Sequence, residues 1–130
     1  MKKFGCAAFI AAALLVGCGG KTASSDQSTP KAAAEMVFNA AKSGDFSQLK
    51  NLCDPSLDND GDSKKVCNVA NQSADDKEGF RKVFKNGKVN GDPVIEGDQA
   101  KVDILFGENG TDKETFNMQK KDGKWYLVSF

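Results

Sequence analysis

The stretch QAKVDILFG, residues 99–107, carries the clearest structural signal in this 130-residue chain. Apolar side chains occupy every second position of it, at Ala100, Val102, Ile104 and Phe106. An alternation with period two predicts a β-strand that buries one face. ETFNMQK (114–120) and KWYLVSF (124–130) extend the pattern, and Asn109-Gly110 and Asp122-Gly123 before them predict hairpin turns. The C-terminal half is therefore predicted to be an antiparallel meander.

One more strand is expected upstream, over Val89–Glu96. Pro93 lies inside it, and a proline has no N–H to donate to a ladder. This strand should therefore lie at an edge of the sheet or contain a bulge.

The first half of the chain has a period near four instead. Thr29 is a good N-cap and Pro30 suits the first helical position, so a helix should begin here. Gly44 should end it. Its apolar face is predicted to comprise Ala33, Val37, Ala40 and Ala41, with Met36 and Phe38 at the margins.

Shorter helices should follow. Asp45, with Gln48 three residues later, has the pattern of a capping box, and Ser63 is expected to cap another helix. A last helical turn or two around Phe80, Val83 and Phe84 should end at Asn86-Gly87. Helices first and a meander second predict a single α+β domain over residues 30–130.

The N-terminus has the pattern of a bacterial secretion signal, over residues 1–17. Lys2 and Lys3 precede an apolar run that is too short to span a membrane. The run ends Leu15-Val16-Gly17-Cys18, which resembles a bacterial lipobox. That resemblance implies a mature chain that begins at a lipidated Cys18, with acyl chains anchoring it in a membrane. Gly19, in place of the aspartate that retains such proteins at the inner membrane, favours the outer membrane, facing the periplasm, if the cell is Gram-negative.

Residues 18–29 are predicted to be the lipidated cysteine and a flexible tether, because they are small and polar. The whole chain has 18 basic and 18 acidic residues, and removal of Lys2 and Lys3 with the signal leaves 16 basic residues. A slightly acidic balance argues against a nucleic-acid partner, which requires a basic face.

Two segments resemble the small bacterial lipoproteins that have an NTF2-like, cystatin-like domain, in the lumazine-binding-like group of unknown function. They are the opening TPKAAAEMVFNAAKSGDFSQLKNLC and the ending GDQAKVDILFGENGTDKETFNMQKKDGKWYLVSF. The resemblance covers about residues 29–130. It implies N-terminal helices packed in the concave face of a curved antiparallel sheet, which makes a cone with one open end. It also implies that a homodimer through the outer sheet face is plausible.

Cys53 and Cys67 are the two cysteines of the mature chain besides Cys18. A lipidated protein folds outside the cytosol, where thiols oxidise. A disulfide between them is therefore expected, and it would close a loop of about 15 residues. Buried thiols and a redox pair are the alternatives, and the redox pair would favour a Cys-x-x-Cys spacing.

Between these cysteines, Asp58, Asp60 and Asp62 stand at alternate positions, as calcium ligands do. Neither possible register places a glycine sixth and a glutamate twelfth. A turn-rich polar loop over Asp54–Asp62 is the favoured interpretation, calcium stays an alternative, and no metal or other cofactor is predicted.

Histidine is absent from the sequence, which removes the commonest general base. An enzyme of this fold would need a buried carboxylate as acid and base, such as Asp103. We therefore expect a membrane-anchored, non-catalytic lipoprotein of the cell envelope. It should bind a small apolar ligand in the cone or a protein partner on the sheet face, where Tyr126, Val128 and Phe130 could form an apolar patch.

The aromatic residues can be core or pocket wall, and the pattern leaves both open. It also leaves open whether Trp125 and Leu127 or their neighbours face inward. The residues predicted for a pocket are Phe38, Phe106, Phe116, Trp125, Asp103 and Tyr126.

Overall fold

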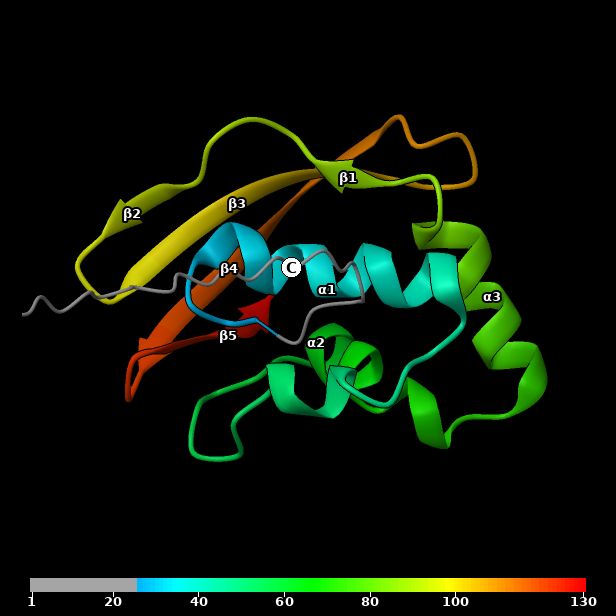
Figure 1. The fold of residues 1–130 in the computed structure, drawn as a ribbon, viewed down its shortest axis with the longest axis horizontal. Helices are drawn as coiled ribbons and strands as arrows, with labels where there is room; N and C mark the ends of the chain where they lie inside the picture. The colour runs from blue at the N-terminus through cyan, green and yellow to red at the C-terminus, as the bar shows by residue number, and fades with distance from the viewer. Residues whose placement is uncertain (1–25) are drawn as a thin grey trace, which may run out of the picture.

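The computed structural model describes residues 26–130, and the predicted signal, Cys18 and most of the tether lie outside the described residues. A helical half precedes a sheet, which confirms the predicted α+β class (Figure 1). The helical half contains α1 (Pro30–Ser43), η1 (Leu49–Leu52), α2 (Gly61–Cys67), η2 (Val69–Asn71) and α3 (Ala74–Phe84). The strands are β1 (Lys88–Val89), β2 (Val94–Glu96), β3 (Gln99–Phe106), β4 (Asp112–Lys121) and β5 (Lys124–Ser129).

The sheet is antiparallel, and β3 lies between β4 on one side and the two short strands β1 and β2 on the other. The predicted alternation of β3 is confirmed, because Ala100, Val102 and Ile104 are buried and the residues between them are exposed. Val102 pairs with Phe116 of β4, so the two strands bury the same face. The predicted Asp122-Gly123 turn joins β4 to β5, with φ of 52° and 81° at its two residues. Positive φ at both positions is the signature of a type I′ hairpin turn.

The strand predicted over Val89–Glu96 is two short strands instead of one. Val89 pairs with Ile104 and Val94 pairs with Lys101, so both pieces lie along β3. Gly91, at φ 87°, and Pro93 occupy the interruption. A left-handed glycine and a residue without an N–H cannot continue a ladder, which accounts for the break.

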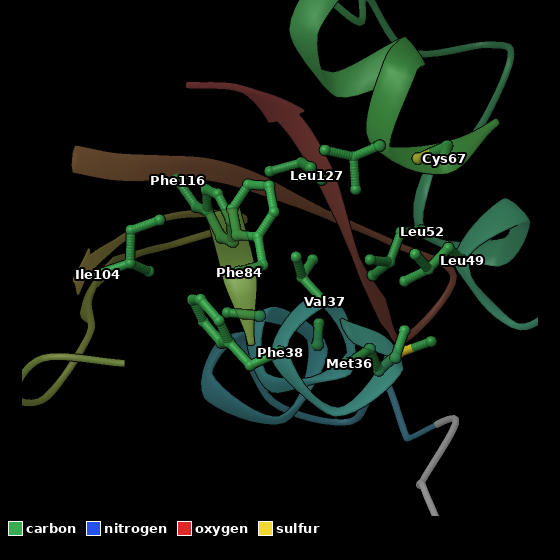
Figure 2. Close-up of a cluster of buried hydrophobic side chains, with 14 of the residues drawn as sticks. Met36, Val37, Phe38, Leu49, Leu52, Cys67, Phe84, Ile104, Phe116 and Leu127 are labelled. Atoms are coloured by element: carbon green, nitrogen blue, oxygen red, sulfur yellow. The ribbon is translucent and has the colours of Figure 1, made fainter. Parts of the chain in front are cut away.

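Helix α1 lies across the buried face of the sheet (Figure 1). Its predicted ends are confirmed: the Thr29 hydroxyl accepts a hydrogen bond from the Ala32 N–H at 3.0 Å, and Gly44 ends the helix at φ 81°. Val37 is fully buried, and the ring of Phe38 stacks on Phe116 with centroids 6.2 Å apart. Figure 2 shows Val37, Phe38 and Phe116 pointing into one core that Leu49, Leu52 and Leu127 extend.

The sequence placed two caps wrongly in the region that follows. Asp45 accepts bonds from the N–H and hydroxyl of Ser47 and so forms a local turn, after which η1 is a 3₁₀ helix and not an α-helix. Asp60, not Ser63, caps α2, and its carboxylate accepts from the Ser63 N–H at 2.8 Å. Aspartate is as good an N-cap as serine, so Asp60 can cap the helix three residues before Ser63. Ser63 then lies in the first turn of α2, where it is buried.

Strand β5 is an edge of the sheet, and two distant segments cover its outer backbone. Gln27 donates from its side chain to the Trp125 carbonyl at 2.9 Å and accepts at its own carbonyl from the Trp125 N–H. Asn59 donates to the Leu127 carbonyl at 2.7 Å, and the Asp60 N–H donates to the Val128 carbonyl. An uncovered edge is a template for pairing with another chain, so this cover protects the fold. Gln27 therefore packs with the domain, three residues before its predicted start.

Candidate functional site

A groove of about 720 Å³ opens among α2, η2, α3, the end of β3, the start of β4 and the C-terminal Phe130 after β5. Its apolar wall is made of Val66, Val69, Phe80, Val83, Phe84, Phe106 and Phe130. Its remaining lining residues are Asp62, Lys65, Gln72, Asp76, Gly79 and Glu114. We call this hollow the phenylalanine groove. An apolar concavity of several hundred Å³ with a few polar groups is the usual form of a small-molecule site.

Phe84 connects the groove to the core. Its ring centroid lies 4.8 Å from that of Phe80, 5.8 Å from Phe106 and 6.4 Å from Phe130, which are all half-buried. On its other side it lies 6.0 Å from the buried Phe38 (Figure 2). Such tilted and offset pairs are the arrangements that aromatic rings favour. The cluster is therefore core on one side and groove wall on the other.

The six residues predicted for a pocket do not form one site. Phe38, Phe116 and Trp125 are buried core side chains, and only Phe106 lines the groove. Asp103 is exposed on the opposite face, where its carboxylate accepts from the Thr115 hydroxyl at 2.9 Å. The alternation of β3 explains this, since Val102 and Ile104 on either side of Asp103 point inward.

The last strand shows the same effect. Trp125 and Leu127 are buried, so the half-buried Tyr126 between them is on the outer side. The apolar patch predicted from Tyr126, Val128 and Phe130 is wrong, because the Phe130 ring packs inward on Phe116 with centroids 5.0 Å apart.

Sequence reasoning missed Val66, Val69 and Val83 as groove wall, and it left Phe80 open as core or wall. Val66 and Val69 recur at helical spacing, which indicates a buried helix face, and in the structure they are both core and wall. Phe80 and Val83 recur on one face of α3, but helical spacing cannot tell whether that face meets a neighbour or a hollow.

The mouth of the groove carries more negative than positive charge. Its titratable residues are Asp62, Lys65, Asp76 and Glu114. Lys65 and Asp62 form an exposed ion pair at 3.5 Å. Within residues 26–130, neither Asp76 nor Glu114 has an ion-pair partner, although one Glu114 oxygen accepts from the Thr115 N–H at 3.1 Å.

The predicted disulfide between Cys53 and Cys67 is present, with 6.0 Å between the two Cα atoms. It joins the residue after η1 to the last residue of α2. Val66, which lines the groove, precedes Cys67, so the bond holds this part of the groove wall against the core.

The aspartates of the Asp54–Asp62 loop make local contacts. Hydrogen bonds from Ser56, together with Lys121 at 2.9 Å, lower the pKa of Asp54 to about 2. Burial alone would raise the pKa of Asp60, but hydrogen bonds from Ser63 and Phe130 outweigh it and lower that pKa. No three histidine, cysteine, aspartate or glutamate side chains within residues 26–130 gather as metal ligands would. In the same residues, none of the helices has the length and apolar character of a membrane span.

The edge strand β2 holds a second feature, with Val94 on the outer face opposite Lys101 and Ile95 on the other face opposite Ala100. Val94 and Ile95 of β2 are 59% and 54% exposed. Val94 also lines a smaller hollow of about 340 Å³, together with Lys101, Asn117 and Val128 among others. Large apolar side chains this exposed on an edge strand can mark an interaction surface.

Two solved structures resemble this fold. One is a SEC-C motif containing protein from Rhodopseudomonas palustris, with a TM-score of 0.50 and 17% identity over 78% of this chain and 77% of that one. The other is a Campylobacter jejuni protein provisionally described as an NTF2-like transpeptidase, with a TM-score of 0.50 and 22% identity over 78% of this chain and 97% of that one. These are likenesses of fold alone, and the second supports the NTF2-like architecture. No protein-family profile and no curated protein matches the chain in sequence.

Proposed function

We propose that this protein is a lipid-anchored, non-catalytic component of the cell envelope that binds a small apolar ligand in the phenylalanine groove. The observation that carries the proposal is the groove itself: about 720 Å³, with a wall of valine and phenylalanine side chains. Half-buried rings such as Phe80 and Phe106 leave apolar area exposed to water, and a ligand that covers this area gains the hydrophobic free energy of its burial.

The membrane anchor in this proposal rests on the sequence, through the lipobox that ends at Cys18. Lipid on that cysteine would hold the domain by a short tether, because Gln27 is already packed against β5. Cys18→Ser should leave an unlipidated precursor, and membrane attachment that survives this change would contradict the anchor.

A binding role is favoured over acid–base catalysis by the placement of the carboxylates. The buried polar residues among residues 26–130 are Gln27, Asn59 and Ser63, so no described carboxylate is held in a dry environment. Burial is the main means by which a fold raises the pKa of a carboxyl toward neutrality. Asp103, the acid–base candidate, is exposed and lies away from the groove.

Gly79 offers a direct test of the groove. It lies in α3 and lines the groove, and a Cβ added there meets no atom within 4 Å. Gly79→Leu should therefore fill the groove mouth without displacing the core. It should also stabilise α3 by up to about 1 kcal/mol, because glycine is a poor helix residue.

The measurement is native mass spectrometry of the full chain isolated from an oxidising compartment. We expect an extra mass that is lost on denaturation, and we expect Gly79→Leu to abolish it. Gly61→Leu is the matched control, since Gly61 also has open space around it but lies outside the groove lining. An extra mass that persists in Gly79→Leu, or is lost equally in the control, would refute binding at this groove.

A protein partner at the edge strand β2 is the second candidate function, favoured by the exposure of Val94 and Ile95. Within the described residues β2 pairs only with β3, so its other edge is open to a partner strand. Val94→Lys with Ile95→Lys should abolish cross-links to such a partner in intact cells and leave groove binding unchanged. Cross-links that persist in this double variant would exclude the β2 edge as the partner site.

A further inference from the structure

The charge at the mouth of the phenylalanine groove indicates which class of ligand it takes. Four titratable groups line the groove, and three of them are carboxylates. The Lys65 ammonium, the one basic group in this lining, pairs with Asp62 at 3.5 Å. The charges of Lys65 and Asp62 cancel, so Asp76 and Glu114 leave a net negative charge beside the apolar groove.

The aromatic wall of the groove also favours a cationic ligand. Phe80, Phe106 and Phe130 are half-buried and line the groove, so their rings contribute to its surface. The face of an aromatic ring is the negative side of its quadrupole and attracts an organic cation within about 6 Å of the centroid. Arg81, the arginine of α3, is turned away, since its Nε donates to the Ala41 carbonyl at 3.0 Å and not to a group of the groove.

The groove contains few groups that could select a single molecule. The buried polar residues among residues 26–130, Gln27, Asn59 and Ser63, are absent from its lining. Orientation in a ligand site normally comes from a few buried donors and acceptors. The recognition available here is therefore apolar contact plus charge, which defines a class of ligands.

We propose that the phenylalanine groove binds amphiphilic organic cations, with the hydrocarbon or aromatic body against the phenylalanines and the ammonium head at the carboxylates of Asp76 and Glu114. This proposal rests on the proposed function, because it requires that the groove binds a small ligand at all. Fatty acids and other organic anions, which share the apolar body, should bind more weakly because the same carboxylates repel them.

The test uses the full chain in nanodiscs of phosphatidylcholine, whose headgroup has no net charge, with empty nanodiscs as the blank. Three water-soluble probes share one ring system: (2-naphthylmethyl)trimethylammonium, 2-naphthaleneethanol and 2-naphthylacetate. Calorimetric titration should find that the cation binds about tenfold more tightly than the alcohol. Two exposed carboxylates and one aromatic ring face together account for this difference in affinity. The anion should bind more weakly than the alcohol, and salt should narrow both differences.

Charge-neutralising variants distinguish the effect of the two carboxylates at the groove rim, Asp76 and Glu114, from the effect of the net charge of the protein. Asp76→Asn with Glu114→Gln should reduce the preference for the cation from about tenfold to about threefold, the remainder coming from the rings. Asp75→Asn with Glu78→Gln removes the same charge from exposed positions of α3 outside the groove lining and should change the preference little. An equal loss in both double variants would overturn the assignment to the rim.

The outcomes distinguish the two proposals. If the three probes bind equally and Gly79→Leu abolishes all of them, groove binding stands and the cation preference is refuted. If no probe binds above the empty-nanodisc blank, both proposals fail.

Discussion

Reduction of the Cys53–Cys67 disulfide should lower the free energy of unfolding by roughly 3 kcal/mol. The two cysteines are 14 positions apart, so the bond closes a loop of about 15 residues in the unfolded chain. Its removal gives the unfolded chain more conformations, and the folded state loses that advantage. For a domain of about 105 residues the entropy of unfolding is on the order of 0.2 kcal/mol/K, so the melting temperature should fall by about 14 °C.

A double variant distinguishes the loop constraint from packing. Reduction keeps both sulfur atoms, and Cys67 is only 7% exposed among the core residues. Cys53→Ala with Cys67→Ala removes the sulfurs as well as the bond, and should cost about 1 kcal/mol more than reduction.

The assay is urea unfolding of the oxidised and reduced protein, followed by the fluorescence of the buried Trp125. The reduced protein should unfold at lower urea and with a larger m-value, because its unfolded chain exposes more surface. A loss of stability under 1 kcal/mol, or a large loss with an unchanged m-value, would refute the reasoning from loop closure.

Three further predictions concern single residues. Asp54→Asn should flatten the acid limb of stability: the pKa of Asp54 is lowered from 3.8 to about 2, so its contribution is present above about pH 4 and is lost as the pH falls toward 2. Urea titrations at a series of pH values measure this, and an unchanged acid limb would contradict it. Asn59→Ala should cost about 1–3 kcal/mol, since it leaves the buried Leu127 carbonyl without its donor at 2.7 Å. It should also expose the β5 edge, so light scattering should find more self-association, and a fully monomeric, equally stable variant would oppose the edge-cover interpretation. Gly87→Ala should cost about 1–3 kcal/mol in thermal unfolding, because its Cβ would lie 2.5 Å from the Leu105 carbonyl oxygen and 2.6 Å from the Phe38 ring, and no loss would mean that both the backbone and the ring can move aside.

Much of the fold was predictable because its signals are local. The cap at Thr29, the stop at Gly44 and the alternation of β3 each depend on a few neighbouring residues and on backbone geometry. The Asp122-Gly123 turn is equally local, since both residues tolerate positive φ. The disulfide followed from the predicted compartment and from an even pair of cysteines.

The candidate site was much less predictable. The sequence indicated that phenylalanines could form a pocket, and Phe106 does line the groove. It did not separate Phe38, which is core, from Phe80, which is wall. Both lie on apolar helix faces, and the difference is whether another element packs against them.

The sequence alone could not decide which residues of the last strand face the core. KWYLVSF is apolar on both faces, so the alternation by itself could not place Trp125 inside and Tyr126 outside. The pairing with β4 fixes the choice, and an irregularity there sets Asn117 against Ser129 and Met118 against Leu127. The cover of β5 by Gln27 and Asn59 also joins residues that are 98 and 68 positions apart from their partners. Periodicity and capping residues thus specify elements, because backbone geometry acts over a few residues, whereas facing, edge cover and the groove depend on which distant surfaces meet.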